Sequence, residues 1–218
     1  MDTQSSGARV AVAASRRSSR SWNAPKVYEG ITKWCVYLVF LLIPLFFLPW
    51  NLDILEVNKQ TLLVILTFVA SLSWLGGMIT NKRFSFRRGW LNLLPFVFLV
   101  SVLVSTVLSL GGFISWVGEA TQEYMSFLSI ASFAVLFYII VNTCAEAKVL
   151  RNVLFAFLIG ASATILVGLG SALGIQLVPF DFADTKSFNT VGTMNAFGVF
   201  LIFTTVFCNA IWLVAQKS

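Results

Sequence analysis

A polar segment before the last apolar run holds the residues best suited to binding an anionic ligand. Gly192 permits a positive φ or a close backbone approach, and Asn195 is a candidate helix cap. A capped helix start directs its N–H groups and the positive end of its dipole outward, which suits a phosphate or an anionic headgroup. The candidate contacts are Lys186, Asn189, Thr190, Gly192, Thr193 and Asn195. A capped turn that merely leads into a helix is the plainer alternative.

Two pairs of carboxylates offer a second kind of chemistry. Glu119 and Glu123 are four residues apart, and Asp181 and Asp184 precede the polar segment. Such pairs do acid–base work in glycosidases, although a solvated loop face explains them equally simply. The chain has no histidine, so the commonest general base and metal ligand is missing. We therefore expect neither a metal nor a cofactor.

The elements that must position these residues are apolar helices. The chain is 58% hydrophobic and only 11% charged, whereas soluble domains carry about 25% charged residues. Six apolar runs each approach the ~20 residues that cross a bilayer as a helix. We predict an all-α, polytopic bundle over residues 28–218, after a disordered basic tail at 1–27. The predicted spans are about 31–49, 61–79, 90–110, 125–144, 153–173 and 196–214.

The charges between the runs predict an orientation. If each run crosses the bilayer, only Lys59 and Lys186 lie on one side, and the other basic residues lie on the opposite side. Lys and Arg collect on the cytoplasmic side of membrane spans, so both termini are expected to be cytoplasmic. The net charge of +6 suits anionic lipid headgroups rather than nucleic acid.

Small residues form a stripe along the fifth run. They recur every four residues, on one face of a helix, which lets another helix approach closely. The stripe consists of Ala156, Gly160, Thr164, Gly168 and Ala172. We expect it to pack in part against spans that this chain lacks. Ser101, Ser105 and Ser109 share a face of the third run and should also meet a helix.

The segment SFNTVGTMNAFGVFL, from Ser187 to Leu201, resembles part of the O-antigen ligase and polymerase superfamily. The stretch from Trp116 to Tyr124 is also similar to an outer loop of that family, and the likeness extends from Tyr28 to the end. It implies a bacterial inner-membrane enzyme that transfers a polyprenyl-diphosphate-linked glycan to an acceptor on the outer face. The six candidate contacts would then meet the diphosphate or the glycan.

The sequence also departs from that family. Members carry arginines around the diphosphate and a histidine in a later outer loop, whereas this chain has no histidine and Lys186 is the nearest base. The resemblance therefore implies an N-terminal half that is inactive without further spans. The other readings are a transporter subunit, which would favour charges deep in a span or an internal repeat, and a non-enzymatic membrane scaffold.

Overall fold

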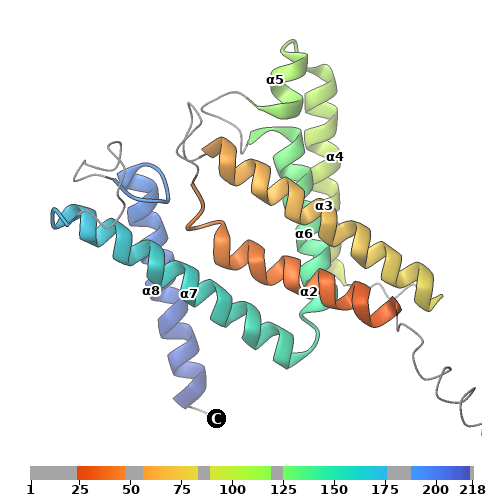
Figure 1. The fold of residues 1–218 in the computed structure, drawn as a ribbon. Coiled ribbons are helices and arrows are strands. Elements are labelled where there is room, and N and C mark those ends of the chain that lie inside the picture. The colour runs from red at the N-terminus through yellow and green to blue at the C-terminus, as the bar shows by residue number, and fades with distance from the viewer. Residues whose placement is uncertain (1–23, 48–55, 83–88, 119–124, 176–187, 217–218) are drawn as a thin grey trace, which may run out of the picture.

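The computed structural model describes residues 24–47, 56–82, 89–118, 125–175 and 188–216, and in this part of the chain it is helical without strands (Figure 1). The all-α prediction is confirmed. The elements are α2 (Ala24–Leu42), α3 (Glu56–Asn81), the 3₁₀ turn η1 (Trp90–Asn92), α4 (Leu93–Leu108), α5 (Gly112–Val117), α6 (Phe127–Thr143), α7 (Ala147–Ala172) and α8 (Met194–Gln216).

Three helices are long and apolar enough to cross a membrane: α3 over Val57–Asn81, α7, and α8 over Met194–Leu213. They correspond to the second, fifth and sixth predicted spans. The helices at the third and fourth spans, α4 and α6, are apolar but have 16 and 17 residues. At 1.5 Å per residue they extend about 24–26 Å, slightly less than the hydrocarbon core.

Two prolines place the first helix differently from the prediction. α2 begins at Ala24, inside the predicted tail. Pro25 is accepted in the first turn because a backbone N–H at that position would have no acceptor within the helix. Pro44 lies inside the predicted span 31–49, but α2 ends at Leu42. Proline disfavours a helical conformation in the preceding residue, Ile43, so the helix ends there.

The buried core lies where α2, α3, α6 and α7 meet. α2 lies between α3 and α7, and α6 crosses behind them (Figure 1). One cluster joins all four helices, and a second joins α2, α3 and α6. The clusters contain Cys35, Val36, Ala70, Ile139 and Val153, and Val39, Leu63 and Leu136. Burial of these side chains therefore fixes α2 at the centre of the bundle.

The small-residue stripe of α7 brings helices of this chain together. A Cβ on Gly160 would overlap the carbonyl oxygen of Leu41 in α2, and one on Gly168 would overlap the ring of Phe197 in α8. Thr164 between them is also buried, whereas Ala172 is exposed. The middle of the stripe thus packs against other helices of this chain.

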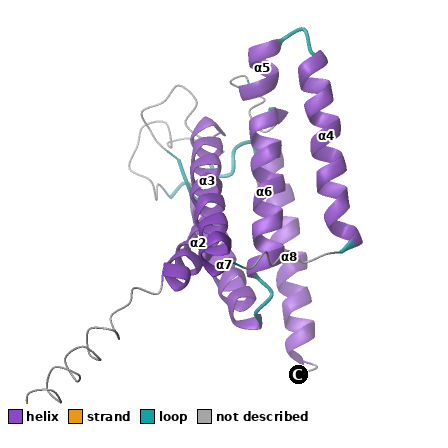
Figure 2. Ribbon diagram, turned by 90° about the vertical axis from the view of Figure 1, so that its right-hand side faces the viewer, coloured by secondary structure: helices purple, strands orange, loops and turns teal. Residues whose placement is uncertain are grey.

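The serine face of α4 is exposed and meets another helix at one end. Ser101, Ser105 and Ser109 are exposed, but the hydroxyl of Ser109 accepts from that of Ser115 in α5, at 2.7 Å. The prediction that these serines meet another helix is therefore confirmed at Ser109, whereas Ser101 and Ser105 are not covered. α4 lies beside α6 and α5 (Figure 2), and its buried residue is Thr106. The hydroxyl of Ser101 donates to the carbonyl oxygen of Val97 in its own helix, at 2.9 Å. This bond gives the hydroxyl an acceptor within its own helix.

Gly160→Ala should destabilise the fold, because the added methyl group forces α7 away from the Leu41 carbonyl. We expect a loss of about 1–3 kcal/mol in the free energy of unfolding, measured by SDS titration of the purified protein in micelles. The matched control is Gly30→Ala in α2, where a Cβ meets nothing within 4 Å. That variant should be as stable as the wild type or more so. Equal stability of Gly160→Ala and Gly30→Ala would contradict the close approach.

Candidate functional site

A buried lysine joins the start of α3 to the segment that precedes α8. Lys59 is only 4% exposed. Its hydrogen-bond partner Thr190 lies 131 residues further along the sequence. Its ammonium donates to the carbonyl oxygen of Thr190 and to that of Val191, the latter at 3.0 Å. A buried charge is tolerated only where such acceptors replace water. The lysine therefore fixes the position of this segment.

Asn189 shapes the same segment from the other side. Its side chain is 1% exposed, and its Oδ1 accepts from the backbone N–H groups of Val191 and Gly192, at 3.0 and 2.9 Å. This is an Asx turn, in which a side chain replaces a backbone acceptor. Gly192 has a φ of 140°, a conformation that favours glycine. The turn presents its carbonyl groups to Lys59 and its N–H groups to Asn189.

Thr190 ties the turn to the end of α2. Its side chain is fully buried, and its hydroxyl donates to the carbonyl oxygen of Pro44 at 3.0 Å. Next to this bond, the rings of Phe47 and Phe188 meet edge to face, with centroids 6.2 Å apart. The ends of α2 and the starts of α3 and α8 thus meet at one junction, which we name the Lys59 end of the bundle.

Thr193 caps α8. Its Oγ1 accepts from the backbone N–H of Ala196 at 3.2 Å, and its carbonyl accepts the first helical bond, from Phe197. The prediction that Asn195 caps the helix is therefore wrong: Asn195 lies in the first turn and is exposed. A cap precedes the helix by one residue and bonds to an N–H two or three positions on, a place that Thr193 occupies.

The structure describes five of the six predicted contacts, and they differ in burial. Asn189 and Thr190 are buried and stabilise the turn, whereas Thr193 and Asn195 are exposed. Gly192 is half-buried. Lys186 lies outside the described residues, as do the carboxylate pairs Glu119/Glu123 and Asp181/Asp184. In the part of the chain that the structure describes, no cluster of His, Cys, Asp or Glu could hold a metal ion.

Sequence reasoning missed Lys59 as a member of this site. The lysine belongs to the polar triplet Asn58-Lys59-Gln60 at the start of α3, and all three side chains are buried. Gln60 points to other elements: its Nε2 lies 3.0 Å from the carbonyl oxygen of Val117 and 3.2 and 2.9 Å from the hydroxyls of Ser126 and Ser129. The sequence feature that could have indicated this site is the run of three polar residues just before an apolar run.

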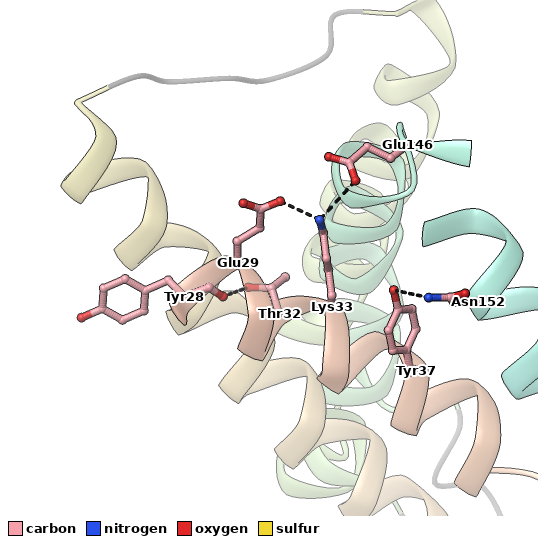
Figure 3. A network of polar contacts seen from close by, with 7 residues as sticks. All are labelled: Tyr28, Glu29, Thr32, Lys33, Tyr37, Glu146 and Asn152. Atoms are coloured by element: carbon pink, nitrogen blue, oxygen red, sulfur yellow. Dashed lines mark hydrogen bonds and ion pairs between the residues drawn. The ribbon is translucent and has the colours of Figure 1, made fainter. Parts of the chain in front are cut away.

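The opposite end of the bundle holds a second polar group. The ammonium of Lys33 in α2 lies 2.6 Å from Glu29 and 3.3 Å from Glu146, in the turn between α6 and α7 (Figure 3). One helical turn further along α2, Asn152 of α7 reaches the hydroxyl of Tyr37 at 3.5 Å. We name this the Lys33 end. Its ion pairs join α2 to the α6–α7 turn.

No protein-family model, curated protein or solved structure matches this chain. The resemblance to O-antigen ligases therefore stays a prediction from the sequence, based on the residues from Ser187 to Leu201 and from Trp116 to Tyr124.

Lys59→Met should loosen the turn before α8, because it removes the donor from the buried carbonyl groups of Thr190 and Val191. A buried acceptor without a donor costs about 1–3 kcal/mol. We expect at least tenfold faster amide exchange in peptides that cover residues 188–192, measured by hydrogen–deuterium exchange. Lys148→Met, at an exposed position in α7, should leave this exchange unchanged. Equal protection in both variants would mean that Lys59 does not hold the turn.

Proposed function

We propose that this chain is the N-terminal membrane portion of an O-antigen ligase-like protein in the bacterial inner membrane. In this proposal the Lys59 end faces outward and contributes to a site for a polyprenyl-diphosphate-linked glycan. The main support for this proposal is that the Lys59 ammonium bonds to the carbonyl oxygens of Thr190 and Val191. It places a cation directly against the segment that resembles the family.

The start of α8 supports a diphosphate ligand. Thr193, which caps α8, and Asn195, in its first turn, are exposed. At such a helix start the backbone N–H groups and the positive end of the dipole favour an anion. Lys186 precedes this turn in the sequence. In the reaction that the family carries out, an acceptor hydroxyl attacks the anomeric carbon and the lipid diphosphate leaves. Cationic groups near the diphosphate stabilise the charge that develops on it.

The contacts at the two ends support a bundle of six alternating spans. The Lys59 end joins segments that the charge pattern puts outside: residues after α2, at the start of α3 and before α8. The Lys33 end joins α2 to the α6–α7 turn, which the pattern puts inside. In this arrangement α2, α4 and α6 cross together with α3, α7 and α8, and both termini are cytoplasmic.

The charge distribution favours this proposal over a transporter subunit. Charged residues within the membrane commonly mark ion or proton pathways. Among the described helices, α4, α6 and α8 contain no Asp, Glu, Lys or Arg. The charged residues of α3 and α7 lie among their first five residues, and those of α2, which are Lys26, Glu29 and Lys33, lie among its first ten. A polar outer end and the apolar remainder of these helices suit a site at the membrane surface.

Reporter insertions test the topology. A reporter after Lys82, at the end of α3, should be cytoplasmic, and one after Asp184 should be periplasmic, because an odd number of predicted spans separates them. Paired fusions to a phosphatase and to green fluorescent protein report the side of the membrane on which each position lies. The same side for both would contradict the six-span arrangement.

Photo-crosslinking tests the ligand. The chain in nanodiscs should be labelled within residues 186–198 by a photoactivatable polyprenyl-diphosphate sugar. Lys186→Ala and Asn195→Ala should lower this labelling, by about tenfold for a lost charge-assisted hydrogen bond. Lys148→Ala, near the Lys33 end, is the control and should not change it. Labelling that both variants leave intact would refute the assignment of this segment as the diphosphate site.

A further inference from the structure

A polar cavity lies at the Lys33 end, outside the site proposed above. Its volume is about 570 Å³, and its walls come from α2, α3, the end of α6 and the α6–α7 turn. The residues that matter for its chemistry are Glu29, Lys33, Trp74, Asn81, Asn142 and Glu146. Hydroxyl groups of Thr32 and Ser73 belong to the same walls.

The charges on the cavity walls are unequal. Lys33 is the only cation among the lining residues, whereas Glu29 and Glu146 supply two carboxylates. Both carboxylates bind the Lys33 ammonium (Figure 3). Their side chains are nevertheless 57% and 63% exposed. Each can therefore accept a further hydrogen bond from a ligand, since a carboxylate has about four acceptor sites. The net negative wall favours a ligand that carries an ammonium group.

An apolar groove adjoins this cavity at Trp74. The groove has a volume of about 500 Å³ and is lined by Leu93 and Phe96 of α4 and by Val135 and Tyr138 of α6, among others. Trp74 lines both the groove and the polar cavity. A single ligand that fits both spaces must have a polar, charged part and a hydrocarbon part. Trp and Tyr are also the residues enriched at the headgroup level of membranes.

We propose that the Lys33 end binds a membrane phospholipid with an ethanolamine headgroup. Its ammonium lies against the outer oxygens of Glu29 and Glu146, and its phosphate accepts from the third N–H of Lys33. One acyl chain follows the groove past Leu93, Phe96 and Val135. A glycerol headgroup lacks the ammonium and carries a net negative charge, so the two carboxylates disfavour it. This site is independent of the outward site at Lys59.

Native mass spectrometry tests the headgroup. The protein, purified from mixed micelles with equal phosphatidylethanolamine and phosphatidylglycerol, should retain the former preferentially. The double variant Glu29→Gln, Glu146→Gln should retain about tenfold less of it, as expected for the loss of charge-assisted bonds. Both side chains are exposed, so an unchanged melting temperature should confirm that the variant is folded. Glu56→Gln, at the opposite end of α3, is the matched control and should behave as the wild type.

A second variant tests the acyl chain. Leu93 is 46% exposed at the start of α4, so Leu93→Trp should fold and fill the groove. The Leu93→Trp protein should retain less phosphatidylethanolamine. In a separate experiment on the wild type, soluble phosphoethanolamine should not displace the bound lipid. Equal retention of the two phospholipids, or retention unchanged by the double variant, would overturn the proposal. Displacement by phosphoethanolamine, or full retention in Leu93→Trp, would also overturn it, because the site would then bind a headgroup alone.

Discussion

The buried ammonium of Lys59 is the constraint on which the arrangement of α8 depends. An ammonium that has lost water needs acceptors, and this one takes the carbonyl oxygens of Thr190 and Val191. Those carbonyl groups point toward it because Asn189 holds the turn and Thr190 is bonded to Pro44. α8 itself is poorly covered: 11% of its most apolar stretch is buried, against 33% of that of α7. The polar junction therefore holds α8 in place, whereas buried contacts along their length hold the other helices.

Between the two polar ends, the bundle is held by close packing. Lipid chains are as apolar as leucine, so helices in a membrane gain little by burying large side chains and associate where small residues permit contact. Gly160 lets α7 reach the backbone of α2, and Gly168 admits the ring of Phe197. The ion pairs of Lys33 lie on an exposed surface, where such pairs contribute at most about 1 kcal/mol. Close packing at the centre and the buried contacts of the Lys59 end thus both stabilise the bundle, whereas the exposed ion pairs of the Lys33 end mainly align α2 with the α6–α7 turn.

Local signals in the sequence were sufficient for the elements and insufficient for the junction. Apolar runs predicted the helices, and the four-residue repeat predicted the close face of α7. The first span was predicted to reach residue 49 because apolar residues continue past Pro44, whereas α2 ends at Leu42. Asn195 and Thr193 are both acceptable caps, and only the register of α8 distinguishes them. The bond from Lys59 to Thr190 joins residues that are 131 positions apart. Local sequence spacing cannot predict a contact between residues so far apart.

The burial pattern divides the segment that resembles the ligase family into two parts with different tasks. The side chains of Asn189 and Thr190 are buried and bonded to the backbone of Val191, Gly192 and Pro44, so they shape the turn. Thr193, which caps α8, and Asn195, in its first turn, are exposed. Recognition of a diphosphate would then depend on a rigid turn that holds the start of a helix in place. A change at Lys59 would act on the ligand only through this turn, whereas a change at Asn195 would act on it directly.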